Sequence, residues 1–238
     1  GLFGATHAGM QGAVIQMVNH GISTGALFLL VGVIYDRRHT RLIKDFGGLA
    51  KPMPVYATLF LIATFASVGV PGTNGFVGEF MVIMGTFGSR DLGNFAGVHA
   101  VGAAFGVILA AVYMLSVVQK VFFGPVGPKN KHLKDITPRE TLALAPLVVM
   151  IFVIGFFPHI FLSRSSASVE MLRKQYNVIA QPQREMYAPP NAPEPPARLI
   201  PESIFDPVFL AGAPTWAPPE QAEKAEAQAP RPPAPPAP

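Results

Sequence analysis

Glu79 is the only charged residue in the stretch of residues 55–87. Charged side chains inside a membrane are costly, and those that occur there face the protein interior and mark ion or proton pathways. Glu79 follows a run rich in glycine and proline, residues 69–75, so it would lie in the first turns of a new helix. Unpaired amide groups there favour a carboxylate, whereas burial disfavours its charge. The pattern predicts a proton-accepting carboxylate beside a broken transmembrane helix, with an interfacial carboxylate at a helix end as the alternative.

The predicted break follows from length and from backbone chemistry. A continuous helix over residues 55–87 would be about 50 Å long, whereas the hydrocarbon core of a bilayer is about 30 Å thick. Pro71 lacks an amide hydrogen and disrupts the preceding turn, and Gly69, Gly72 and Gly75 tolerate irregular backbone angles. We therefore expect two half-helices joined at these residues.

A polar stripe runs along the apolar segment of residues 12–35. Gln16, His20 and Thr24 recur every four residues, so they lie on one side of a helix. A histidine at mid-membrane can pass on a proton, because its charge changes near physiological pH. The stripe therefore predicts a proton pathway, while hydrogen bonding between packed helices remains an equal alternative.

Lys120 is a further candidate for proton transfer, since Tyr113 and Ser116 share its helix face. It precedes Gly124-Pro125 by only a few residues, however, so its long stem can carry the ammonium group to the lipid headgroups. We favour this second interpretation. The histidines have no partner at the spacing of metal ligands, and no metal site is expected.

Composition indicates a membrane protein. Half of the 238 residues are hydrophobic, 13% are charged, and the mean hydropathy is +0.37 although the end of the chain is polar and rich in proline. The sequence has no cysteine, so it cannot hold a Cys-ligated iron-sulfur cluster, and any electron transfer is expected elsewhere. It also lacks the dense basic stripe of nucleic-acid-binding proteins and a nucleotide-binding loop.

The pattern predicts an all-α integral membrane protein with about four transmembrane helices, at residues 12–35, 55–87 (broken), 98–123 and 142–162. Five basic residues between 37 and 51 and three between 129 and 134 place these two loops in the cytoplasm. We expect residues 1–165 to form the helical bundle and residues 166–238 an extramembrane Pro/Ala-rich tail that is mostly disordered. Because Gly1 is no initiator, we also expect a fragment of a longer chain.

Several ordered blocks carry a family resemblance. These are residues 11–21 (QGAVIQMVNHG), 26–28 (ALF), 35–41 (YDRRHTR), 47–49 (GGL) and 70–80 (VPGTNGFVGEF). Together they resemble the antiporter-like subunits of respiratory complex I, NADH:quinone oxidoreductase, and the M-type (chain 4) subunits most closely. The resemblance implies that Glu79 is the glutamate of the broken helix and that His20 is the proton-pathway histidine of the preceding helix.

The same resemblance implies a place in a larger assembly. This chain would supply the last four helices of a subunit built from two inverted repeats, embedded in a lipid bilayer. The abundance of alanine and proline in the tail favours a bacterial inner membrane over a mitochondrial one. Its partners would be other membrane-arm subunits, including neighbouring antiporter-like ones. NADH, FMN, iron-sulfur clusters and quinone would be bound by other subunits, with no cofactor in this chain.

The expected mechanism is proton exchange between Glu79 and His20 through ordered water, coupled to quinone reduction elsewhere in the complex. Two alternatives stay open. One is a subunit of a Na⁺/H⁺ antiporter or a membrane-bound hydrogenase-type complex, whose corresponding subunit often has lysine at the position of Glu79. The other is a truncated structural module that moves no ion.

Overall fold

The structure is a computed structural model that describes residues 1–187, and most of the predicted Pro-rich tail, residues 188–238, lies outside this part. Every regular element of the described residues is a helix, which confirms the all-α class. The α-helices are α1 (His7–Arg38), α2 (Pro54–Val68), α3 (Asn74–Phe87), α4 (Ala96–Phe122), α5 (Pro138–Phe156) and α6 (His159–Tyr187). Four short 3₁₀ helices are η1 (Leu2–Gly4), η2 (Ile43–Asp45), η3 (Gly93–Phe95) and η4 (Pro128–Asn130).

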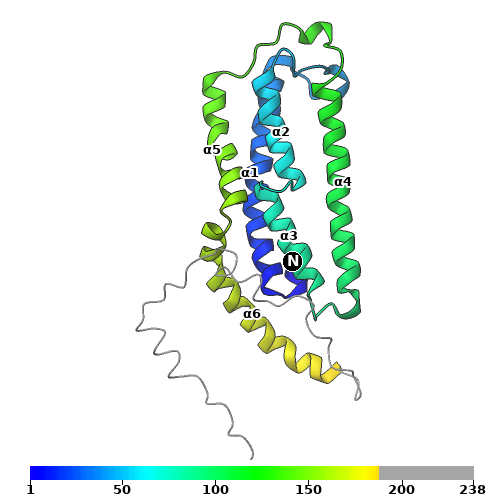
Figure 1. The fold of residues 1–238 in the computed structure, drawn as a ribbon, viewed down its shortest axis with the longest axis vertical. Coiled ribbons are helices and arrows are strands. Elements are labelled where there is room, and N and C mark those ends of the chain that lie inside the picture. Colours follow the sequence, from blue (N-terminus) through cyan, green and yellow to red (C-terminus); the bar gives the residue numbers. More distant parts are fainter. Residues whose placement is uncertain (188–238) are drawn as a thin grey trace, which may run out of the picture.

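Helices α1 to α5 form an elongated bundle, and α6 crosses one end of it obliquely (Figure 1). Within the described residues, α1, the segment from Gly93 to Phe122 and α5 are each long and apolar enough to cross a membrane. The two shorter helices α2 and α3 lie end to end, and together they match the longer helices in extent (Figure 1). The described residues thus have helices for three crossings and a pair of half-helices for a fourth, in agreement with the sequence prediction of about four.

The predicted break lies between α2 and α3. Helix α2 ends at Val68 and is capped by Gly69, whose positive φ of 78° is left-handed, and Gly72 has a φ of 90°. Pro71 lies between them, and α3 starts at Asn74. Gly75 lies inside α3, where a Cβ atom would meet the backbone carbonyl of Ala66, so this glycine allows the two half-helices to approach.

Glycines also bring α1 and α3 together along their length. A Cβ atom on Gly12 would lie 2.7 Å from the Cβ of Met81, and one on Gly78 would meet the side chain of Gln16. A Cβ atom on Gly85 would meet the backbone of Gly9. Membrane helices gain little from the hydrophobic effect and associate through close van der Waals packing, which small residues permit. This tight crossing places Gln16 opposite Glu79.

Aromatic packing closes the bundle at the end near the basic loops. The ring of Phe122 on α4 lies 5.7 Å from that of Tyr56 and 4.8 Å from that of Phe60, both on α2. The Tyr56 hydroxyl donates a hydrogen bond to the backbone oxygen of Leu30 on α1, at 3.0 Å, which satisfies a buried polar group. This cluster joins α1, α2 and α4.

The end of the fourth predicted segment differs from the structure. Helix α5 ends at Phe156, not at Leu162, because Pro158 has no amide hydrogen and restricts the residue before it. Leu162 belongs to α6, which continues to Tyr187, so the boundary drawn at residue 165 falls inside a helix. Tertiary contacts hold α6 against the bundle: Leu162 and Val169 are buried, and Val169 packs against Met10 of α1.

Candidate functional site

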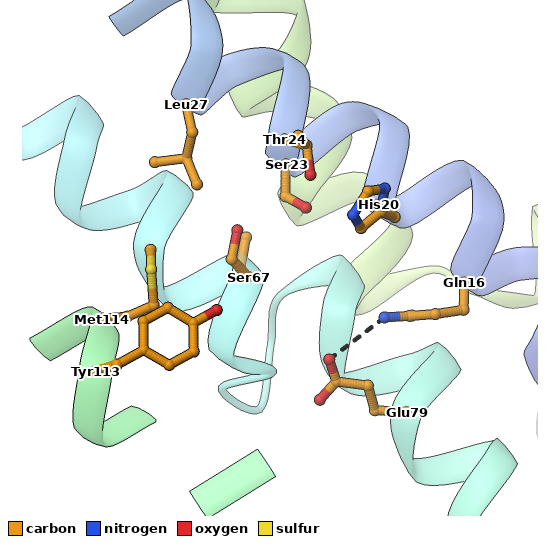
Figure 2. A pocket seen from close by; sticks show the side chains of 10 residues that line it. Gln16, His20, Ser23, Thr24, Leu27, Ser67, Glu79, Tyr113 and Met114 are labelled. Atoms are coloured by element: carbon orange, nitrogen blue, oxygen red, sulfur yellow. Dashed lines mark hydrogen bonds between the residues drawn. The ribbon is translucent and has the colours of Figure 1, made fainter. Parts of the chain in front are cut away.

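A cavity of about 180 Å³ lies among four helices beside the break (Figure 2). A water molecule occupies about 30 Å³ in the liquid, so a cavity of this size has room for a few waters. Its lining comes from α1, α2, α3 and α4, and it mixes polar with apolar side chains. The lining residues are Gln16, His20, Ser23, Thr24, Leu27, Ala66, Ser67, Glu79, Tyr113 and Met114.

Glu79 is half-buried in the second turn of α3 and lines the cavity. Its Oε1 accepts a hydrogen bond from Nε2 of Gln16, at 3.3 Å, as the dashed line in Figure 2 marks. Its Oε2 lies against Gly69, where a Cβ atom would collide with this oxygen. The carboxylate is thus held between α1 and the backbone of the break.

His20 lines the same cavity and is exposed in this chain. It projects from α1 near Glu79 (Figure 2), and within the described residues no hydrogen bond joins the two side chains. A proton passing between them therefore needs an intermediate carrier, and the cavity has room for water. Thr24 lines the cavity one turn further along α1, so the structure brings the whole predicted stripe to one place.

Lys120 does not line the cavity. It is exposed in the last turn of α4, near the end of the bundle that carries the basic loops. From this position the ammonium group of Lys120 can reach the headgroup region. Tyr113, which shares a helix face with Lys120, does line the cavity, so the structure separates two residues that the sequence grouped together.

Sequence reasoning missed several residues of the site. Ser67 of α2 lines the cavity, and its hydroxyl is buried without a hydrogen-bond partner among the described residues. Asn74, the first residue of α3, is fully buried and donates through Nδ2 to the backbone oxygen of Asn19, at 3.2 Å. An asparagine directly after the Gly/Pro run was the available signal for Asn74, whereas nothing in the local pattern distinguishes Ser67.

Neither the sequence nor the described residues offer a metal centre. The chain has no cysteine. Within residues 1–187, no three histidine, aspartate or glutamate side chains gather in a group that could hold a metal ion. The chemistry that this arrangement can perform with its own groups is the gain, loss and transfer of a proton.

Comparison with known proteins agrees with this arrangement. Residues 1–117 match the family described as "NADH:quinone oxidoreductase/Mrp antiporter, TM". The matched part contains α1, α2, α3 and most of α4, and with them every residue that lines the cavity. The chain is therefore a membrane protein.

Curated proteins are similar to this chain over most of its length. NADH-quinone oxidoreductase subunit M of Rhodobacter capsulatus is 43% identical over 178 residues, which are 74% of this chain and 34% of the relative. Subunit M of Rickettsia felis is 42% identical over 173 residues, 72% of this chain and 34% of the relative. NADH-ubiquinone oxidoreductase chain 4 of Marchantia polymorpha is 39% identical over 174 residues, with the same coverages of 72% and 34%.

A solved structure has a similar fold. It is a chain of respiratory complex I from Thermus thermophilus with bound NADH, which matches with a TM-score of 0.64 and 32% identity over 72% of this chain and 35% of that chain. The resemblance to M-type subunits drawn from the sequence is confirmed. The chain spans about a third of the length of the relatives that it matches.

Proposed function

We propose that this chain is part of a membrane-arm subunit of a proton-translocating NADH:quinone oxidoreductase. In this proposal Glu79 takes up and releases the transported proton, and His20 exchanges it with Glu79 through water in the cavity. The observation that carries the proposal is the cavity itself. It brings Glu79 and His20 to one space that has room for water. The names of the curated relatives support the same assignment.

The break has a defined part in this function. A continuous helix keeps its amide and carbonyl groups bonded to each other, so it offers nothing to water at mid-membrane. The segment between Val68 and Asn74 interrupts this pattern next to Glu79, and such breaks are tolerated where they are buried in protein or line a cavity. The break therefore supplies local hydration at the depth where the proton is held.

The proposed orientation places the ends of α1 and α4 and the starts of α2 and α5 at the cytoplasm of a bacterium, in its inner membrane. Positively charged loops lie at this end of the bundle, whereas Arg90 is the only basic residue of the loop between α3 and α4. The same proposal puts Glu79, in the second half-helix, between the two membrane faces.

The proposed partners are the lipid bilayer, other membrane-arm subunits of the complex and neighbouring antiporter-like subunits. Helix α4 supports this, because most of its apolar side chains are uncovered by the described part of this chain. Val98, Val101, Phe105 and Val112 are all more than half exposed. NADH oxidation and quinone reduction, with FMN and iron-sulfur clusters, belong to other subunits in this proposal, and this chain contributes the proton step.

The experiment that tests the function replaces Glu79 by glutamine in the full-length subunit. Glu79→Gln keeps an oxygen that accepts from Gln16 but cannot bind and release a proton. We expect NADH-driven proton uptake in inverted membrane vesicles to collapse while the complex assembles normally. The matched control is Asp36→Asn, the same carboxylate-to-amide change at an exposed site near the end of α1, which should leave uptake intact.

The outcomes separate the open alternatives. Normal proton uptake and normal NADH oxidation in Glu79→Gln would show that the carboxylate is dispensable and the proposed mechanism wrong. Loss of assembly in both Glu79→Gln and Glu79→Asp would favour a structural module. Uptake that requires sodium would favour the antiporter alternative, which the family description also includes.

A further inference from the structure

A chain of side-chain amides joins the helix break to Glu79. At the break, the backbone oxygen of Asn74 accepts a hydrogen bond from Nδ2 of Asn19, at 2.7 Å. The same Nδ2 donates to Oε1 of Gln16, at 3.3 Å, and Nε2 of Gln16 donates to Oε1 of Glu79, at 3.3 Å. Asn19 and Asn74 are both fully buried, so water does not compete for the contact between them, whereas Gln16 and Glu79 line the cavity. This series of hydrogen-bonded amides, called the amide chain below, links α1 to α3 at the start of the half-helix that carries Glu79.

The backbone oxygen of Asn74 determines the donor-to-acceptor direction of every hydrogen bond in the amide chain. A carbonyl oxygen only accepts, so Asn19 must turn its NH₂ group, and not its oxygen, towards the break. Because this NH₂ group carries a second hydrogen, it faces the oxygen of the Gln16 amide. Gln16 is then left with its own NH₂ group facing Glu79. A reversal of either amide would place like groups against each other, which costs the energy of an unsatisfied buried group.

The two oxygens of Glu79 are therefore unequal. If the proton were on Oε1, it would face the NH₂ group of Gln16, and two donors would oppose each other. If the proton is on Oε2, Oε1 accepts the hydrogen bond from Gln16 whether Glu79 is charged or neutral. Oε2 points away from Gln16, as Figure 2 shows, and lies on the side of Gly69. Because Gly69 has no side chain, Oε2 fits against its backbone without a collision.

We propose that Asn19 and Asn74 are positioning residues that assign the transported proton to Oε2 of Glu79, acting through Gln16. This inference rests on the proposed function, because it names the atom that carries the proton in it. The break thus has a second role besides hydration, because the backbone oxygen of Asn74 sets the direction of the hydrogen bonds in the amide chain. The carboxyl group keeps one oxygen for anchoring and the other for proton exchange.

Infrared difference spectroscopy of the purified complex tests this directly, because the carbonyl band of a protonated carboxyl group moves to lower wavenumber when its oxygen accepts a hydrogen bond. The band of Glu79 is identified by its loss in Glu79→Gln. In the unmodified protein, we expect the band of a hydrogen-bonded carbonyl, since Oε1 accepts from Gln16. Gln16→Met removes this donor at similar volume, and the band should shift to higher wavenumber.

Asn19→Leu tests the positioning role itself. It leaves Gln16 in place but frees its amide to rotate, so the band should shift or split although the donor is still present. Gln16→Met keeps the contact between Asn19 and Asn74, so it gives a result even where Asn19→Leu fails to fold. Thr58→Ala, which removes an exposed hydroxyl that bonds within α2, is the control and should leave the band in place.

An unshifted band in Asn19→Leu, together with a lower unfolding temperature, would mean that Asn19 only packs helices and would overturn the proposal. So would an unshifted band in Gln16→Met, or a sample in which Glu79→Gln removes no band. Failure of the proposed function is a separate result: normal proton uptake in Glu79→Gln would reject proton transport by Glu79, while the band positions would still report whether the amide chain orders its carboxyl group.

Discussion

The guanidinium group of Arg37 binds both carboxylate oxygens of Glu140, at 2.9 and 2.8 Å. This pair joins the last turn of α1 to the first turn of α5, and Arg37 also donates to the backbone oxygens of Lys134 and Asp135. Asp135 in turn accepts from the backbone amides of Val55 and Tyr56 at the start of α2. One arginine therefore organises the ends of three helices on the side of the basic loops.

Arg37→Lys should destabilise the bundle. Lysine keeps the charge but not the planar fork that holds two oxygens at once. With hydrogen bonds to charged groups contributing about 1.5–3 kcal/mol each, and both side chains partly exposed, we expect a loss of about 1–3 kcal/mol. Thermal unfolding of the detergent-solubilised protein measures it, with Arg90→Lys in the opposite loop as the control. Equal unfolding temperatures for the two variants would contradict this role.

Gly155→Ala should disturb the break from the side of α5. A Cβ atom at Gly155 would meet the backbone oxygen of Gly72, and this crowding of a packed site costs about 1–3 kcal/mol. Proton uptake should fall with stability. The matched control is Gly102→Ala in α4, where a Cβ atom meets nothing within 4 Å of the described chain. That change should be neutral or stabilising, because alanine loses less backbone entropy in a helix.

Gly78→Ala should act on Glu79 through Gln16. The added methyl group would meet the Cβ and Oε1 of Gln16, so α1 and α3 would have to separate and the Gln16–Glu79 hydrogen bond would lengthen. We expect a loss of stability of about 1–3 kcal/mol and reduced proton uptake in vesicles. Gly106→Ala, an open position on α4, serves for comparison. If Gly78→Ala and Gly106→Ala had equal stability and proton uptake, the crossing of α1 and α3 would tolerate the added methyl group and this prediction would be wrong.

His20→Gln should reduce proton uptake while assembly persists, because glutamine cannot pass on a proton by changing its charge. His20 makes no hydrogen bond to the described residues, so its replacement removes no packing contact of that kind. The same change at His99, an exposed histidine near the start of α4 and outside the cavity, should leave uptake intact. Equal uptake in the two variants would remove His20 from the mechanism.

Acid should weaken the charged contacts of Glu170 on α6. The Arg173 side chain, by hydrogen bonding to Glu170, lowers the pKa of that carboxyl group below its ordinary value of 4.5, against a smaller opposing effect of burial, and His7 of α1 adds a further lowering effect. A lowered pKa in the folded state contributes stability above pH 4.5 that is lost as the pH falls through the folded-state pKa. The unfolding temperatures of the unmodified protein and of Glu170→Gln should therefore differ at pH 7 and converge as the pH falls below 4.5 and through the folded-state pKa. A constant difference would reject the role of the charge.

The sequence by itself determined the elements that depend on local chemistry. Four apolar segments of spanning length, the Gly/Pro break and the basic loops each follow from residues close in the chain. The structure has an apolar helix or pair of half-helices in each segment and the break between α2 and α3. Spacing also placed Gln16, His20 and Thr24 on one side of α1, and they line one cavity.

Only the tertiary structure decided what depends on contacts between distant residues. It continued α6 through residues that composition assigned to the tail, because Leu162 and Val169 are buried. It brought Tyr113 of α4 to the cavity but not Lys120, two turns further on, because a side chain's neighbours depend on how helices cross. The amide chain from Asn74 to Glu79 likewise bridges α1 and α3 across 55 to 63 positions of sequence, a relationship that no local pattern encodes.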